Sequence, residues 1–99
     1  MKDSYILNIK DICVSTYTNA DGMSLKLAVS NLLNTYDHIV ISFHSIDSVS
    51  TSFLNSSFGE LISDYGLDIF KDRIKVTNYT NSLITTIKKY INSFSLEYA

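Results

Sequence analysis

The sequence contains no proline and no tryptophan, and only three of its 99 residues are glycine. Proline and glycine mark flexible linkers and domain boundaries, so their scarcity argues against a second domain. Hydrophobic residues make up 45% of the chain and charged residues 18%, which is typical of a packed globular domain rather than of disorder. We therefore expect a single domain over residues 1–99.

Cysteine is nearly absent as well. Cys13 is the only one, which excludes an internal disulfide framework and a zinc site built from cysteines. It lies between Ile12 and Val14, where we expect a small, buried or half-buried apolar residue. His38 and His44 stand at opposite ends of an apolar run that is about 20 Å long if extended. We expect no metal site and no cofactor.

The chain also lacks an excess of positive charge and any long hydrophobic run. Its formal net charge is −2, whereas a general nucleic-acid binder should show a basic stripe. The first residues are not followed by an apolar stretch long enough for a signal peptide, and no segment reaches transmembrane length. We therefore expect a cytoplasmic protein that binds neither nucleic acid nor membrane.

Two short β-prone runs open the chain, Tyr5–Ile9 and Ile12–Tyr17. Lys10 and Asp11 between them can form a two-residue hairpin turn, although they lack the glycine that such a turn favours. We predict a hairpin here. The alternative is one bent strand preceded by an arm.

The clearest helix follows. An apolar stripe with helical spacing predicts it over about residues 22–34, with Asn19 or Asp21 as its N-cap. The next run, Ile39–Phe43, is short and continuously apolar. Such a run predicts a central strand buried on both faces.

A second helix is predicted over Phe53–Tyr65, with Gly66 closing it. Gly59 lies inside this helix, where glycine costs roughly 1 kcal/mol relative to alanine. A close approach to a neighbouring strand or helix explains how a glycine is accommodated there. Leu67–Asp72 is expected to be a connector with two apolar anchors.

The last two elements are a strand and a helix. Arg73–Thr77 alternates polar and apolar residues, as a strand with one solvated face does. Asn78 or Thr80 can cap the final helix, whose apolar stripe runs from Leu83 to Phe94. The order is β(β)αβαβα, which predicts an α/β single domain with a small mixed sheet of about four strands and three helices.

The stretch from His38 to Gly66 is a strand–loop–helix unit with hydroxyls at the expected helix start. Within it, Ser42–Leu61 resembles a bacterial family of small STAS-like proteins with the pattern (D/S)-F-x-x-(I/V)-x-x-(I/V)-S-x-S-F-x-(D/N)-x-x-x-G-x-L. The residues that match the pattern include Phe43, Ile46, Val49, Ser50, Ser52, Phe53, Asn55, Gly59 and Leu61. The resemblance covers most of the chain, and it implies a STAS-like fold with its core between about residues 12 and 94.

The wider relatives are the anti-sigma-factor antagonists, in which the second serine of an Asp-Ser-Ser-Gly helix start is phosphorylated by a partner kinase. This resemblance makes Ser52 the candidate phosphoacceptor, with Thr51 before it. The sequence departs from the pattern on both sides, because Ser50 stands in place of the aspartate and Phe53 in place of the glycine.

From this resemblance we expect a non-enzymatic regulatory module that docks a protein partner. The partner class implied is an anti-sigma factor or a histidine-kinase-like ATPase, and the module itself is expected to be a monomer or weak oligomer. Phosphorylation of Ser52 is the implied gate of docking. The candidate partner-binding residues are Ser48, Val49, Ser50, Thr51, Ser52, Phe53 and Asn55.

Four alternatives compete with this interpretation. Ser50 or Ser52 equally suits a plain helix N-cap, which needs only a side-chain oxygen. Ser52, His44 and Asp47 are the residue types of a hydrolase triad. The nucleophile of such an enzyme lies in a strained turn between glycines, however, and no glycine flanks Ser52. The same helix start also suits a sensor that binds an anion or a nucleotide. The last alternative is an accessory subunit of a mobile-element or phage-defence system.

Overall fold

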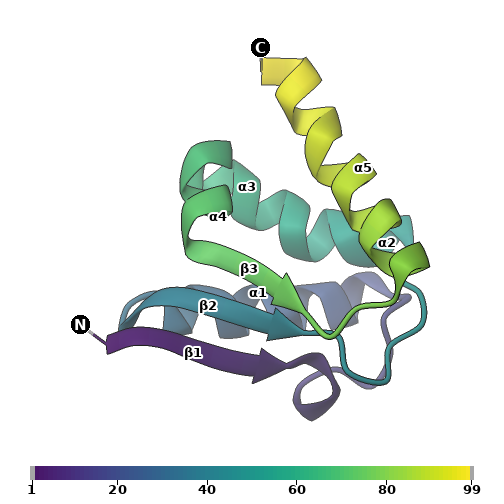
Figure 1. Ribbon diagram of the computed structural model, residues 1–99, viewed down its shortest axis with the longest axis horizontal. Helices are drawn as coiled ribbons and strands as arrows, with labels where there is room; N and C mark the ends of the chain where they lie inside the picture. Colours follow the sequence, from purple (N-terminus) through teal and green to yellow (C-terminus); the bar gives the residue numbers. More distant parts are fainter. Residues whose placement is uncertain (1, 99) are drawn as a thin grey trace.

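The structure, a computed structural model, describes residues 2–98 of the protein. Three strands alternate with helices along the chain (Figure 1). The elements are β1 (Lys2–Asn8), the 3-10 turn η1 (Ile9–Asp11), α1 (Asn19–Leu32), β2 (Tyr36–Ser42), α2 (Thr51–Leu54), the π-helical turn η2 (Asn55–Gly59), α3 (Glu60–Tyr65), α4 (Leu67–Arg73), β3 (Ile74–Thr77) and α5 (Asn81–Tyr98).

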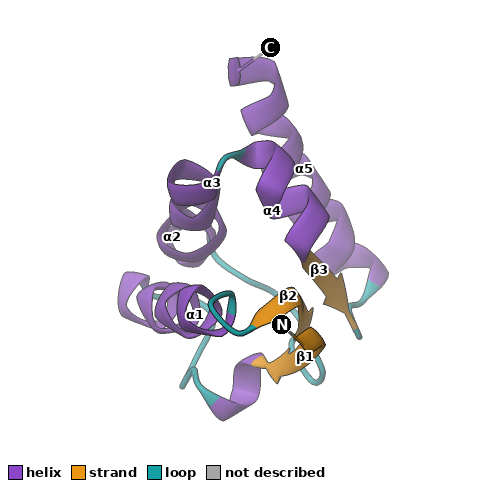
Figure 2. Ribbon diagram, turned by 90° about the vertical axis from the view of Figure 1, so that its left-hand side faces the viewer, coloured by secondary structure: helices purple, strands orange, loops and turns teal. Residues whose placement is uncertain are grey.

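The strands form one parallel sheet in the order β1-β2-β3. Both crossover connections move in the same direction along the sheet, and right-handed crossovers then place their helices on the same face. Figure 2 shows this arrangement, with α1 and the α2–α3 segment side by side on one side of the strands. The domain is therefore a two-layer α/β structure.

The core lies between this helical layer and one face of the sheet. Leu7, Ile39 and Ile41 alternate along their strands toward the helices and are buried. On the opposite face, Ile6 is 63% exposed and its register partner Val40 is only half-buried. The prediction that the central strand is buried on both faces is therefore wrong, because an apolar valine on an open face looks the same in the sequence as one in a core.

The predicted N-terminal hairpin is also wrong. β1 begins earlier, at Lys2, and pairs in parallel with β2. After Asn8 the chain makes one 3-10 turn that buries Ile9, and residues 12–17 form a loop. Lys10 and Asp11 lack the glycine that supports a tight hairpin turn. The sheet of the described chain consequently has three strands, all parallel, instead of four mixed ones.

The segment 51–65 is one continuous helical stretch, as predicted, although it begins two residues early and contains the π-helical turn η2. Gly59 ends that turn and faces Tyr90 of α5, so closely that a side chain at Gly59 would collide with the phenol oxygen. The Tyr90 hydroxyl donates a hydrogen bond to Asn55 Oδ1 over 2.8 Å. Burial and then the Glu60 carboxylate raise the pKa of Tyr90, which keeps this donor protonated. The predicted close approach at Gly59 is confirmed.

This contact gives a prediction whose sign depends on Tyr90. Gly59→Ala alone is expected to destabilise the protein by about 1–2 kcal/mol, because the phenol must move and its bond to Asn55 is lost. In a Tyr90→Phe background the phenol oxygen is absent. Gly59→Ala should then stabilise the protein by up to about 1 kcal/mol, because alanine has the higher helix propensity. Urea unfolding of the four proteins in this cycle measures the coupling. Equal effects of Gly59→Ala in both backgrounds would contradict the role given to Tyr90.

Gly66 separates α3 from α4 and has a φ of +89°, a value that favours glycine. The helix before it ends as predicted. The residues after it were predicted to be a connector but form the short helix α4, which buries Phe70 against the core. This helix has only seven residues, and its one pair of core-facing residues, Leu67 and Phe70, is too short a pattern to distinguish a helix from a connector with two apolar anchors.

The final helix, α5, lies beyond β3 at the edge of the sheet opposite β1 (Figure 1). Thr80 is its N-cap, since the Thr80 hydroxyl accepts a hydrogen bond from Leu83 N over 3.1 Å. Asn78, the other predicted cap, instead donates its amide to Ser42 Oγ over 2.9 Å. Leu83 and Ile87 anchor α5 in the core.

Candidate functional site

Two loops meet at the carboxyl end of the sheet, the β1–α1 loop (residues 9–18) and the β2–α2 loop (residues 43–50). Open parallel sheets bind ligands at this edge, at the point where the strand order reverses, but the order β1-β2-β3 contains no reversal. Both loops lead directly into helices of the covering layer. The loop of the predicted strand–loop–helix unit therefore lies at the carboxyl edge of the sheet, beside the β1–α1 loop.

Hydrogen bonds join the two loops. Thr16, buried beneath the surface, donates its hydroxyl to the carbonyl of Ser48 over 2.7 Å. Ser50 donates its backbone N–H to the Thr16 carbonyl over 3.0 Å and its hydroxyl to the Tyr17 carbonyl over 2.8 Å. The hydroxyls of Tyr17 and Ser48 are also 2.7 Å apart. These bonds fix the loops as a single surface.

Asp21 organises the first loop. Its carboxylate accepts hydrogen bonds from the hydroxyls of Ser15 and Thr18, each over 2.7 Å, and from Val14 N over 3.2 Å. These bonds, led by the one from Ser15, lower the pKa of Asp21. Thr18 is the N-cap of α1, where its hydroxyl accepts from Asp21 N over 3.0 Å. The predicted caps, Asn19 and Asp21, are thus wrong by one and three positions, and the Asp21 carboxylate instead accepts a hydrogen bond from the capping hydroxyl of Thr18.

Ser50 caps the second helix. Its hydroxyl accepts a hydrogen bond from Phe53 N over 3.0 Å, which is the plain capping role considered for Ser50 or Ser52. Thr51 and Ser52 follow in the first turn and are both exposed. Neither of their hydroxyls makes a hydrogen bond within the described residues. The turn therefore presents two unengaged hydroxyls at the positive end of a helix.

The remaining candidate partner-binding residues differ in accessibility. Phe53 is fully buried in the core, so its ring is not open to a partner. Val49 is half-buried and packs against the same core. Asn55 is exposed, but its side-chain oxygen accepts the bond from Tyr90 described above. Ser48 is exposed beside the helix start.

Two exposed residues of the β1–α1 loop join this surface without having been predicted. Val14 is completely exposed, and Tyr17 is 56% exposed with its hydroxyl on Ser48. Tyr17 and Ser48, which this bond joins, are 31 positions apart in the sequence. No local pattern signals such a contact. The candidate docking surface consists of Val14, Tyr17, Ser48, Thr51 and Ser52.

Within the described residues, hydrogen bonds do not connect the side chains that were considered as a hydrolase triad, Ser52, His44 and Asp47. Burial and then the Asp21 charge raise the pKa of Cys13 to about 11, so its half-buried thiol is protonated at neutral pH. Among residues 2–98, no group of three or more His, Cys, Asp and Glu side chains is placed to hold a metal ion.

The protein is a small α/β domain with a parallel sheet. At the carboxyl end of this sheet, the exposed first turn of a helix follows its N-cap, Ser50. The chain belongs to the family described as a STAS-like domain of unknown function (DUF4325), whose model matches residues 21–83. The match runs from α1 to the start of α5 and contains the whole β2–α2 loop. This confirms the resemblance found in the motif from Ser42 to Leu61.

No curated protein and no solved structure matches the chain significantly. The helices of the described chain are all too short or too polar to span a membrane.

Proposed function

We propose that this domain is a regulatory interaction module that docks a partner protein through the candidate docking surface, with phosphorylation of Ser52 as its gate. The observation that carries the proposal is the exposed, unengaged Ser52 hydroxyl in the first turn of a capped helix. The partner class follows from the family resemblance and is a histidine-kinase-like ATPase or anti-sigma factor.

The local structure favours modification at Ser52 over its neighbours. The Ser50 hydroxyl already makes two hydrogen bonds, because it accepts one from Phe53 N and donates one to the Tyr17 carbonyl. A phosphate on Ser50 would therefore break the cap and the contact between the loops. A phosphate on Ser52 would break neither, and it would bring nearly two negative charges to the positive end of the helix. The domain would stay folded while its docking surface changed charge.

The departures from the antagonist pattern fit this geometry. Ser50 replaces an aspartate but still supplies the capping oxygen. Phe53 replaces a glycine, and its ring is buried in the core, where it anchors the first turn of the helix. Neither substitution covers the Ser52 hydroxyl, because Ser52 is exposed. The position is therefore accessible to a kinase.

Co-expression with candidate ATPases, followed by intact-mass analysis, tests the gate. The wild-type chain should gain the mass of one phosphate, and Ser52→Ala should gain none. Ser63→Ala is the matched control, since Ser63 is exposed on α3 of the same helical segment but far from its start. It should be modified like the wild type. Modification that persists in Ser52→Ala would remove Ser52 from the proposal.

Docking is tested separately by titrating the partner with Ser52→Glu and Tyr17→Ala. Both changes alter the docking surface without touching the core, so each should weaken binding about tenfold or more while the thermal unfolding profile stays near that of the wild type. Ser63→Ala again serves as the control. Unchanged affinity in both variants would show that the partner binds elsewhere.

A further inference from the structure

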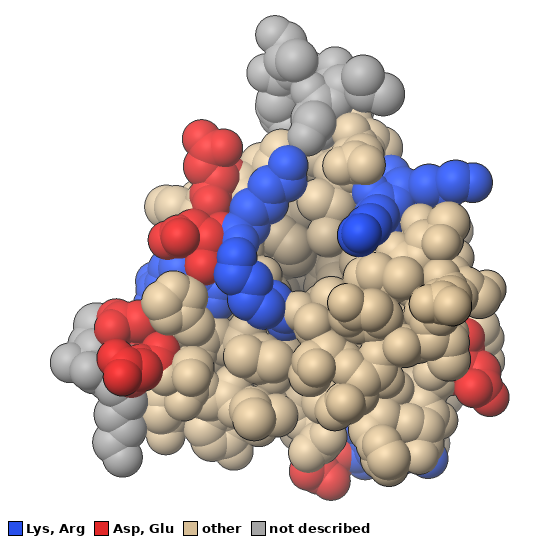
Figure 3. Space-filling model, in the orientation of Figure 1, with Lys and Arg blue, Asp and Glu red and all other residues tan. Residues whose placement is uncertain are grey.

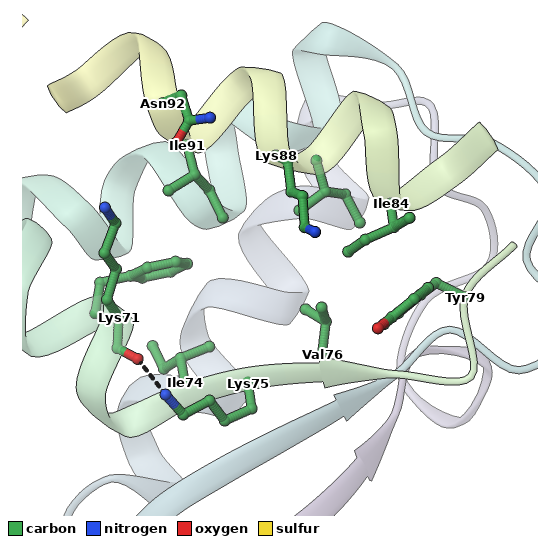
Figure 4. Close-up of a pocket in the computed structure, with 11 residues that line it drawn as sticks. Lys71, Ile74, Lys75, Val76, Tyr79, Ile84, Lys88, Ile91 and Asn92 are labelled. Atoms are coloured by element: carbon green, nitrogen blue, oxygen red, sulfur yellow. Dashed lines mark hydrogen bonds between the residues drawn. The ribbon is translucent and has the colours of Figure 1, made fainter. Parts of the chain in front are cut away.

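A pocket of about 420 Å³ lies between α5 and the α4–β3 segment. Its volume is within the range of pockets that hold small organic ligands. The walls are aliphatic and aromatic and come from three elements: Phe70 from α4, Ile74 and Val76 from β3, and Ile84 and Ile91 from α5. α5 is thus anchored by its buried residues but leaves an apolar space beside β3 (Figure 4).

Three lysines border this pocket. Lys71, Lys75 and Lys88 line the pocket, and no acidic residue does so in the described part of the chain. Three of the eight lysines and arginines of a protein with net charge −2 therefore border one pocket. Figure 3 shows Lys or Arg side chains on both sides of the hollow. Among the described residues, none of these three lysines forms an ion pair. The ion pair that is present joins Lys26 to Asp64, and neither residue lines the pocket.

Two polar side chains point into the pocket. In Figure 4, Lys88 reaches down from α5 and the Tyr79 hydroxyl points into the same space from the β3–α5 turn. Lys75 donates its ammonium to the Lys71 carbonyl over 2.6 Å, which holds that charge at the rim. A cation and a hydroxyl that converge over apolar walls match a ligand with one anionic head and an aliphatic body.

We propose that this pocket binds an aliphatic carboxylate, a medium-chain fatty acid in chemical class. The carboxylate accepts hydrogen bonds from Lys88 and Tyr79, and the chain lies against Phe70, Ile74 and Ile91. Burial of the aliphatic chain supplies the affinity, and the lysines select the negative charge. The pocket shares no residue with the candidate docking surface, so this inference does not depend on the proposed function.

Decanoate, below its critical micelle concentration, is the probe. Isothermal titration calorimetry should show saturable binding of one molecule per chain, and shortening the acid should weaken binding roughly fourfold per methylene. Decanol and decyltrimethylammonium have the same aliphatic body without the anionic head, and both should bind at least about tenfold more weakly. Absence of saturable binding, or equal binding of decanol, overturns the proposal.

Two neighbouring lysines provide a matched pair of variants. Lys88→Gln should weaken decanoate binding about tenfold or more, whereas Lys89→Gln removes the same charge from the next position of α5, which does not line the pocket, and should leave affinity unchanged. Far-ultraviolet circular dichroism checks that both variants are folded. Equal weakening in both would indicate unspecific attraction by positive charge. A dimer that forms with increasing concentration and excludes decanoate would assign the pocket to a second copy of the chain. Either result overturns the proposal.

Discussion

Replacing Phe58 with alanine is expected to lower the free energy of unfolding by about 3–5 kcal/mol. Phe58 is fully buried in the π-helical turn η2. Its ring meets Phe43 edge-on, with centroids 6.3 Å apart, and Phe70 at 5.4 Å. One side chain thus joins the end of β2, the helical layer and α4. Its loss removes apolar burial and two aromatic contacts and leaves a cavity.

This loss is a large part of the 5–15 kcal/mol that stabilises a typical domain. Urea unfolding followed by circular dichroism measures it, provided that the dependence of the unfolding free energy on denaturant concentration is unchanged. Phe58→Leu keeps much of the volume and should lose distinctly less. A loss below about 1 kcal/mol for Phe58→Ala would mean that the surrounding residues collapse into the space, contrary to the cavity expected here.

The elements predicted correctly from the sequence are those with a long periodic stripe or a strong punctuating residue. α1 and α5 have such stripes, and Gly66 ends the helical segment before it with its positive φ. The strand that became β3 also lies within one residue of its predicted start. In these places local preference and tertiary packing agree.

The errors concern properties that only distant residues decide. β1 is a strand because β2, more than thirty positions later, pairs with it in parallel. The loop at residues 12–17 is equally β-prone, but it has no strand to pair with and instead bonds to the β2–α2 loop through Thr16. β-propensity describes the fit to a pleated surface and does not select the partner.

The site shows the same division. The expectation of a capped helix start rich in hydroxyls could be formed from Ser50–Ser52 alone, because an N-cap is a local interaction. That Ser50 is the capping residue, and that Thr51 and Ser52 are left exposed, required the structure. Tyr17 and the lysine-lined pocket could not be predicted, since each is formed by segments that are separate in the sequence.

A second large effect is expected at Arg73, the last residue of α4. Its guanidinium donates three hydrogen bonds to backbone carbonyls, those of Leu33 over 2.9 Å, Tyr36 over 2.8 Å and Asp37 over 2.8 Å. The Leu33 carbonyl belongs to the C-cap of α1, and the other two carbonyls belong to the first two residues of β2. A positive charge at that end of a helix is favourable, and carbonyls there lack partners within the helix.

Arg73→Ala should therefore lower the free energy of unfolding by about 2–4 kcal/mol, because the carbonyls of one buried and two half-buried residues at the junction of α1 and β2 lose their charged donor. Arg73→Lys should recover little of this, since an ammonium cannot reproduce the planar fork that reaches three acceptors. Lys89→Ala removes an exposed charge instead and should change stability by no more than about 0.5 kcal/mol. Urea unfolding of the three variants gives the comparison. Full recovery by lysine would show that charge alone matters at this position, and the fork geometry would then carry no part of the stabilisation.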